Sequence, residues 1–235
     1  MKISVVVPAH NEQDNLPILV KNLQDLIKKN KLDAEIVLVD DNSNDSTPVI
    51  CDNLKREYDN VFTIHRFGNR GMGNALLEGS KKAKGNVIVW VMADLSDDLN
   101  TIPKFLEKIE NGYDIVFGSR YMEGGSSGDL SPFKTIASRG FSTLSGIFLG
   151  IKVHDITNAF RAFKKEVLNS VKLESSDFAI SPEFALKAHL AEFKLDEVPT
   201  TYSNRKKGIA KFKMFEMTKK YFKVFLCVLI QKFKN

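Results

Sequence analysis

Short apolar runs alternate with longer amphipathic segments along the first half of the chain. Residues 3–7 predict a buried strand, and residues 14–29 carry apolar side chains at helical spacing. The alternation continues, and predicts strands at 36–39, 61–65, 87–92 and 115–118, separated by helices at 46–58, 73–83 and 101–110. Such alternation forms a mainly parallel sheet with helices on both faces, so the predicted fold class is α/β.

Polar clusters follow the first four predicted strands. They read PAHNE, DDNSND, HRFGNRGMGN and ADLSDD. Because ligands of such sheets bind beyond the carboxyl ends of the strands, we expect the four clusters to form a single site.

The second half is less regular. Residues 121–132 are rich in Gly and Ser and predict a mobile loop that could act as a lid. Helices are expected at 135–149 and 182–190, and strands near 161 and at 196–203. We expect one domain over residues 1–213, followed by a C-terminal helix at 214–235.

The composition and charge favour a cytoplasmic protein. Of 235 residues, 43% are hydrophobic and 27% charged, which suits a folded domain, and two cysteines exclude a disulfide framework. No signal peptide and no run of roughly 20 apolar residues is present, so no membrane span is predicted. Residues 205–235 carry ten Lys or Arg and one acid, a balance of +9, which leaves the preceding residues near −4 out of the total of +5. We expect no nucleic-acid partner.

The basic tail ends in an apolar helical pattern. Phe222, Phe225, Leu226, Leu229 and Phe233 share one helical face, and Lys219, Lys220 and Lys223 cluster at one end. This pattern is typical of a helix that lies in a membrane interface. The alternative is a helix docked on the domain.

The polar clusters leave several interpretations open. Asp40 and Asp41 could bind a nucleotide, or DDNSND could be only a turn with Ser46 as helix cap. The pair Gly71 and Gly73 lacks the third glycine of a dinucleotide motif. Asp94, Asp97 and Asp98 could hold a cation, or the last two could be first-turn helix acids.

Taken together, the motifs resemble family 2 glycosyltransferases of GT-A fold. DIVFGSRY, DITNAFRAF, EVPTTY and RKKGIAK are similar to the polyprenyl-phosphate hexosyltransferases, of which dolichol-phosphate mannosyltransferase is the best known. The resemblance extends from residue 3 to about residue 213. It implies an inverting transfer of a hexose, mannose or glucose, from a nucleotide sugar to a polyprenyl or dolichyl phosphate. GDP-mannose and UDP-hexoses both fit as donors.

The resemblance assigns roles to individual residues. The nucleotide sugar is expected to contact Pro8, His10, Glu12, Asp40, Asp41, Gly71 and Asp94. A divalent Mg²⁺ or Mn²⁺ is expected at Asp94, Ser96 and Asp97. The family usually has Asp-x-Asp here, whereas this chain has Met92 at the first position.

The acceptor side is predicted to be cationic. An acceptor phosphate, whose second pKa is about 6, needs no strong base near pH 7 but does need cations. The resemblance places Arg120, Lys134, Ser138 and Arg139 on that phosphate, and Arg205 and Lys211 over the donor diphosphate. Asp155 and Arg161 are expected to pair and fix the loop under the sugar. Phe160 and Phe163 are expected in the core, Asn158 could touch the sugar, and Glu183 is either a pocket contact or a surface residue.

The sequence therefore predicts a glycosyltransferase peripheral to the cytoplasmic face of a membrane. Its expected partners are the nucleotide sugar, the polyprenyl phosphate lipid and the membrane surface, and the resemblance also allows a small membrane subunit. Transfer to a soluble or protein hydroxyl acceptor, and a non-catalytic sugar-nucleotide-binding subunit, are the alternatives.

Overall fold

In the computed structural model, residues 1–204 and 214–234 are described, and their strands form one mixed sheet. The order is β3-β2-β1-β4-β6-β5-β7. β1 to β4 are parallel, β6 is antiparallel to β4 and β5, and β7 is parallel to β5. The strands span Ile3–Ala9 (β1), Ala34–Asp41 (β2), Val61–Arg66 (β3), Val87–Trp90 (β4), Ile115–Ser119 (β5), Arg161–Lys164 (β6) and Leu195–Pro199 (β7).

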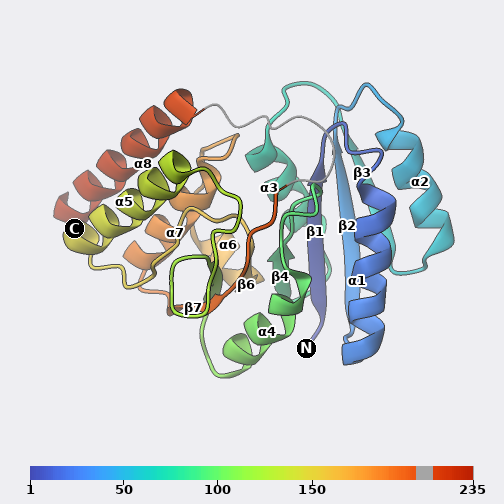
Figure 1. The fold of residues 1–235 in the computed structure, drawn as a ribbon, viewed down its shortest axis with the longest axis horizontal. Helices are drawn as coiled ribbons and strands as arrows, with labels where there is room; N and C mark the ends of the chain where they lie inside the picture. Colours follow the sequence, from blue (N-terminus) through green and yellow to red (C-terminus); the bar gives the residue numbers. More distant parts are fainter. Residues whose placement is uncertain (205–213, 235) are drawn as a thin grey trace.

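Helices cover both faces of this sheet (Figure 1). Leu16–Asn30 (α1), Thr47–Glu57 (α2) and Ile102–Glu110 (α4) contribute to the core on one face. The other face is covered by Met72–Lys82 (α3), Pro132–Leu149 (α5), Lys165–Ser170 (α6), Ile180–Leu190 (α7) and Met214–Lys234 (α8). The predicted α/β class with helices on both faces is confirmed.

The two cores follow from alternation along the strands. Val5 and Val7 point into the core with α1, while Val6 between them packs with α3 on the opposite face. All three are essentially buried, as expected for parallel strands covered on both sides. Trp90 ends β4 in the second core, where its ring meets Phe163 edge-on at 5.1 Å.

The strand after residue 87 is shorter than predicted. It ends at Trp90 rather than at Met92. The Met92 amide donates to the Asp97 carboxylate over 2.8 Å, so a side chain replaces the next bond of the sheet. The chain therefore turns early and places Met92 to Asp97 at the edge of the sheet.

The Gly/Ser-rich segment is anchored rather than free. The Ser126 amide donates to the Thr200 carbonyl over 3.0 Å, and the Tyr202 amide donates to the Ser126 carbonyl over 2.9 Å. The expectation of a mobile loop is therefore not supported around Ser126, where the loop pairs with the chain that follows β7.

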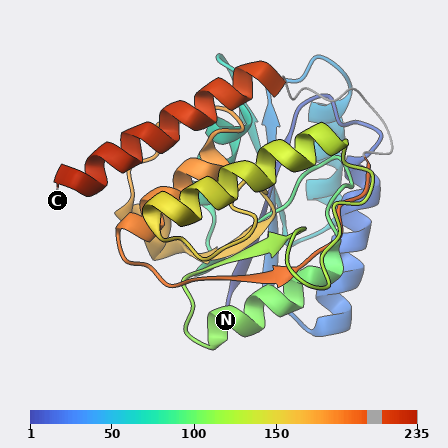
Figure 2. The same ribbon diagram turned by 60° about the vertical axis from the view of Figure 1, so that its left-hand side comes forward.

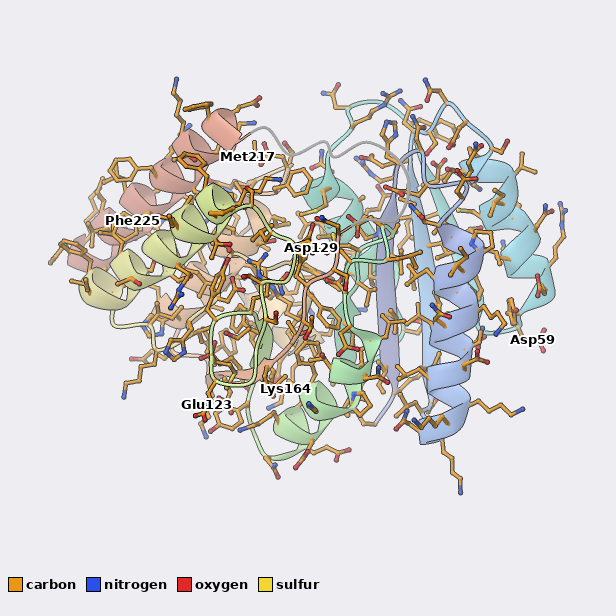
Figure 3. The ribbon with its side chains drawn as sticks, in the orientation of Figure 1. Asp59, Glu123, Asp129, Lys164, Met217 and Phe225 are labelled. Carbon is orange, nitrogen blue, oxygen red and sulfur yellow. The ribbon has the colours of Figure 1, made fainter. Side chains whose placement is uncertain are left out.

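The tail forms α8, which lies beside α5 (Figure 2). Met217, Phe225 and Val228 are buried, with 5%, 3% and 1% exposure. Figure 3 shows where Met217 and Phe225 lie. The Phe225 ring contacts the Phe141 ring of α5 at 6.3 Å between centroids. The prediction that Phe225 faces a membrane is thus wrong, because that side chain docks on the domain, while Phe222, Leu226 and Phe233 remain exposed.

Candidate functional site

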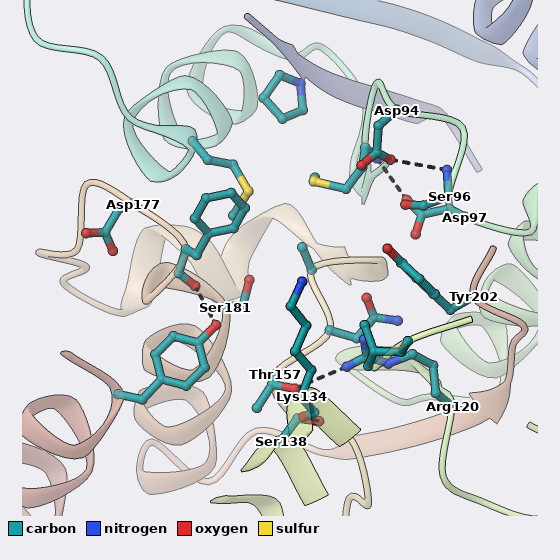
Figure 4. A pocket seen from close by; sticks show the side chains of 18 of the residues that line it. Asp94, Ser96, Asp97, Arg120, Lys134, Ser138, Thr157, Asp177, Ser181 and Tyr202 are labelled. Atoms are coloured by element: carbon teal, nitrogen blue, oxygen red, sulfur yellow. Dashed lines mark hydrogen bonds between the residues drawn. The ribbon is translucent and has the colours of Figure 1, made fainter. Parts of the chain in front are cut away.

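A cavity of about 950 Å³ lies where the carboxyl ends of β1, β2 and β4 meet α5, α7 and α8 (Figure 4). All four predicted loops contribute to its wall, through Pro8, Asp41, Gly71 and Asp94. α5 and α8 add apolar side chains, namely Ala137, Phe141, Leu144 and Phe222. The cavity thus joins a polar end at the sheet to an apolar end between two helices.

One wall carries acidic side chains. Asp94, Ser96 and Asp97 line the cavity after β4. The Asp94 Oδ1 accepts the Ser96 amide over 3.1 Å, and Leu95 between them has a φ of 64°. This tight turn places Asp94 and Asp97 at the same wall (Figure 4).

These two carboxylates suit a divalent cation. Burial raises the pKa of Asp97 to about 7; the Met92 amide opposes the rise, and the charge of Asp94 adds to it. A carboxyl group whose charge is disfavoured by burial and by a neighbouring carboxylate is a place where a cation lowers the free energy. Within residues 1–204 and 214–234, no group of three or more His, Cys, Asp or Glu side chains is arranged to hold a metal ion.

Asp98 differs from Asp94 and Asp97, because its side chain caps a turn. Its Oδ1 accepts the Asn100 amide over 3.1 Å and caps a short 3-10 turn, Leu99–Thr101, ahead of α4. Asp98 does not line the cavity. Asp98 is therefore the cap of this 3-10 turn and not an acid in the first turn of α4, which contains no acidic residue.

A second wall carries the buried cation Arg120. Its guanidinium makes two bonds to Asp155, of 2.6 Å from Nε and 2.9 Å from Nη2, and a third to the Thr157 hydroxyl over 3.2 Å. Burial alone would lower the pKa of Arg120, but the adjacent Asp155 raises it above its usual value. Arg120 is therefore a permanent, fixed cation facing the cavity.

The predicted pair of Asp155 with Arg161 is wrong. Arg161 is fully buried and donates instead to backbone carbonyls, over 2.8 Å to Ser181 and also to Ile156 and Asn158. Its guanidinium lies 4.7 Å from the centre of the Phe117 ring. Arg161 therefore ties the loop after Asp155 to the start of α7 from beneath the cavity.

The remaining predicted acceptor residues lie on α5. Lys134 and Ser138 line the cavity, and the Ser138 hydroxyl is hydrogen-bonded to Tyr121. Arg139 is exposed, does not line the cavity, and sits 5.5 Å from the centre of the Tyr121 ring. Arg120 lies 5.2 Å from the same ring. We correct the assignment of Arg139, which supports the Tyr121 ring instead of lining the cavity.

The predicted nucleotide end is formed by the first two loops. Pro8, His10, Glu12 and Asp41 all line the cavity. A His10 ring nitrogen is 3.0 Å from the Asp41 carbonyl, and Asp41 Oδ2 accepts the Gly71 amide over 2.7 Å. The first, second and third loops are thus bonded to one another.

Asp40 is placed differently from its prediction. It is buried, but it does not line the cavity. Its Oδ1 accepts the Ser43 amide over 3.1 Å, and its Oδ2 is 3.3 Å from a His65 ring nitrogen. Neighbouring residues of a strand point to opposite faces, so Asp40 supports the loop while Asp41 reaches the cavity.

The glycines of NRGMGN serve packing. A Cβ at Gly71 would lie 2.1 Å from the Ser176 carbonyl oxygen, and one at Gly73 would lie 2.6 Å from that of Ser175. The Asn74 amide donates to the Ser176 carbonyl over 3.1 Å. Because these two positions have no side chain, residues 175–177 can pack directly against the start of α3. This role of the glycines was not predicted from the sequence.

Alanine at Gly73 is expected to lower the free energy of unfolding by about 1–3 kcal/mol, because backbone atoms surround the missing Cβ. Gly140→Ala on α5 is the matched control, since no atom lies within 4 Å of its Cβ position. That control should stabilise by up to about 1 kcal/mol through helix propensity. Urea denaturation measures both, and equal effects of the two substitutions would contradict the packing argument.

His65 makes stability depend on pH. Its ring nitrogens lie 3.3 Å from Asp40 and 3.0 Å from Asp52. Burial alone would lower the pKa of His65, but the two carboxylates raise it above its usual 6.5. The folded state therefore holds the proton more tightly, so this stabilisation is complete below pH 6.5 and is lost as pH rises through the folded pKa. Denaturation between pH 6 and 9 should show a smaller decline for His65→Gln; an unchanged decline would refute the role.

Arg205 and Lys211 lie outside the described residues, and their roles stay predictions. The flanking residues Asn204 and Thr218 both line the cavity. The Ser203 amide donates to the Ser96 carbonyl over 3.0 Å. Described residues on both sides of this segment, Asn204 and Thr218 of α8, thus belong to the cavity wall.

Several residues that line the cavity were not predicted as site residues from the sequence. They are Arg70, Thr157, Asp177, Phe178, Ser181, Tyr202 and Tyr221. Most follow β5, β6 or β7, where short elements give weak patterns. For Thr157, the polar DITN segment after an apolar helix could have indicated a position at the site.

Comparisons with known proteins agree with this arrangement. Residues 4–172 match the profile of the family described as Glycosyl transferase family 2. The chain belongs to this family. The dolichol-phosphate mannosyltransferase of Pyrococcus furiosus is 36% identical over 216 residues, which are 91% of this chain and 60% of that protein. This chain thus spans about three fifths of that relative.

Two further comparisons extend the family match. The polyprenol monophosphomannose synthase of Mycolicibacterium smegmatis is 30% identical over 94% of this chain and 84% of its own length. A structure of glucosyl-3-phosphoglycerate synthase from Mycobacterium tuberculosis, in complex with Mn²⁺ and UDP-glucose, has a TM-score of 0.75 at 14% identity. It covers 97% of this chain and 79% of that chain, and confirms the GT-A fold of this family 2 member.

Proposed function

We propose that this family 2 glycosyltransferase moves a hexose from a nucleotide sugar to a polyprenyl phosphate. The supporting observation is the cavity, which brings the carboxylates Asp94 and Asp97 and the cations Arg120 and Lys134 to one space with an apolar end. Its relatives named for dolichol phosphate and polyprenol support the same lipid class.

The described residues suggest how the phosphates are held. Mg²⁺ or Mn²⁺ would be bound by Asp94, with Asp97 beside it, and would supply positive charge that offsets charge on the leaving diphosphate. Arg120 and Lys134 would hold the acceptor phosphate opposite.

The transfer itself needs no protein base. A phosphate oxygen of the acceptor attacks the anomeric carbon, the bond from that carbon to the diphosphate oxygen breaks, and the configuration inverts. The acceptor phosphate is largely ionised near pH 7, so no proton has to be removed. Holding two anions in line is then the main task of Arg120 and its neighbours.

The test is a transfer assay with the purified chain. GDP-mannose, GDP-glucose, UDP-glucose and UDP-galactose are each offered with polyprenyl phosphate and Mg²⁺ or Mn²⁺, and a lipid-linked monosaccharide is the expected product. Glycerol and free sugars replace the lipid in parallel reactions. Transfer to these hydroxyl acceptors, with none to the lipid phosphate, would contradict the proposal.

We further propose that the enzyme works at the cytoplasmic surface of a membrane. Within residues 1–204 and 214–234, no helix is both long and apolar enough to cross a bilayer. α5 and α8 nevertheless expose large apolar side chains, namely Phe133, Ile136, Ile147, Phe148, Phe215, Phe222, Leu226, Ile230 and Phe233. The apolar end of the cavity lies between these two helices, where a lipid tail would leave.

Two glutamates in this surface should weaken membrane binding. Ile147→Glu with Ile230→Glu places charges at positions that are 71% and 53% exposed, and should lower binding to anionic phospholipid vesicles at least tenfold, since apolar burial contributes about 25 cal/mol per Å². Val49→Glu on α2, at a position 62% exposed, is the matched control. Vesicle co-sedimentation measures the effect; equal binding by the double variant and the control would argue against this surface.

A further inference from the structure

The loop of residues 174–179 is fixed to α7 by a buried carboxylate. Glu183, 2% exposed, accepts the Glu174 amide over 3.0 Å, the Ser175 amide over 2.8 Å and the Lys187 ammonium over 2.6 Å. Burial alone would raise the pKa of Glu183, but these donors lower it. Glu183 is thus neither a pocket contact nor a surface residue: it is the anchor of the loop.

The other side of the same loop rests on α3. The Ser176 carbonyl accepts the Asn74 amide and occupies the space that a side chain at Gly71 would need. Anchored on both sides, the loop presents Asp177 at the cavity wall.

Two donors fix the Asp177 carboxylate. Its Oδ1 accepts the Ala179 amide over 2.9 Å, and its Oδ2 accepts the Lys220 ammonium of α8 over 2.5 Å. The side chain is 23% exposed. Because a carboxylate has about four acceptor positions, roughly two remain for a ligand.

The position of Asp177 separates it from the phosphate groups. Figure 4 shows Asp177 across the cavity from Asp94 and from Arg120. The Lys220 ammonium already balances the charge of Asp177, so its remaining acceptor positions suit hydroxyl donors rather than an ionised phosphate, which has no proton to donate. The hexose and the ribose are the hydroxyl-bearing parts of a nucleotide sugar, and binding of a free nucleoside diphosphate, which contains only the ribose, distinguishes them.

We propose that Asp177 accepts hydrogen bonds from hydroxyl groups of the transferred hexose and thereby selects among hexose epimers. This inference rests on the proposed function. Hydrogen bonds from hydroxyls to a carboxylate are charge-assisted. A carboxylate held in one position accepts them only from hydroxyls that point toward it. An epimer with one hydroxyl inverted loses such a bond.

Asp177→Asn tests the inference because it keeps the shape of the side chain. We expect kcat/KM for the preferred hexose to fall about 10- to 100-fold, in line with the loss of a charged hydrogen bond. The preference between GDP-mannose and GDP-glucose, or between UDP-glucose and UDP-galactose, should shrink. Calorimetry should show weaker binding of the nucleotide sugar but unchanged binding of GDP or UDP.

Glu174→Gln is the matched control, because it removes a carboxylate of the same loop that is 66% exposed and does not line the cavity. Its epimer preference should equal that of the wild type. An intact preference in Asp177→Asn, an equal loss in Glu174→Gln, or weaker binding of the free nucleoside diphosphate by Asp177→Asn would overturn the inference. Absent transfer to polyprenyl phosphate by the wild type would refute the proposed function instead, while the calorimetry would still test Asp177.

Discussion

Asp94→Asn is expected to lower kcat for hexosyl transfer by roughly 100- to 1000-fold, the range observed when one charge-stabilising group is removed from a reacting centre. Asp94 lines the cavity with one oxygen bonded to the Ser96 amide. Its other oxygen is available to a divalent cation. Because Met92 occupies the position of the first family carboxylate, the loss should not be offset by a neighbour there.

The measurement is transfer rate against Mg²⁺ or Mn²⁺ concentration. Asp94→Asn should need more metal to reach its lower plateau. Asp98→Asn is the control, since asparagine also caps a turn and Asp98 does not line the cavity. A variant at Asp94 with wild-type kcat and metal requirement would remove this carboxylate from the mechanism.

Arg161→Met is expected to lower the free energy of unfolding by about 3–5 kcal/mol, because each buried carbonyl left without its donor costs about 1–3 kcal/mol. The guanidinium is wholly buried, and burial lowers its pKa to about 9, against the opposing charge of Asp155. Without Arg161, the carbonyls of Ser181, Ile156 and Asn158 lose their donor.

Lys164→Met in the same strand is the control. Lys164 pairs with Asp114 over 2.7 Å near the surface, with 31% of its side chain exposed, so its loss should cost less than about 1 kcal/mol. Guanidinium denaturation of both variants gives the comparison. Similar small losses at Arg161 and Lys164 would mean that the buried guanidinium adds little to stability.

The parts predicted well from sequence are those governed by local patterns. Apolar runs such as that of β1 have the period and length of buried strands, and the polar residues after them must reach the carboxyl edge in a parallel sheet. This placed Pro8, Asp41, Gly71 and Asp94 at one cavity without any coordinates.

Partners of buried charges could not be predicted in this way. Asp155 and Arg161 are near in sequence, yet Asp155 accepts hydrogen bonds from Arg120, the residue after β5, and Arg161 donates to backbone carbonyls. Pairing of this kind depends on which side chains share a desolvated space, and that is decided by packing of distant segments.

The sequence alone determined the α/β order of elements, the edge that carries the polar loops, and the family. It did so because periodicity and motif spacing are local properties of the chain. Only the tertiary structure decided that Gly71 and Gly73 make room for residues 175–177, that Phe225 docks while its neighbours face outward, and that Asp177 enters the cavity. Each of these contacts joins segments that are far apart in the chain. Such contacts produce no periodic pattern in the sequence, so the sequence alone does not reveal them.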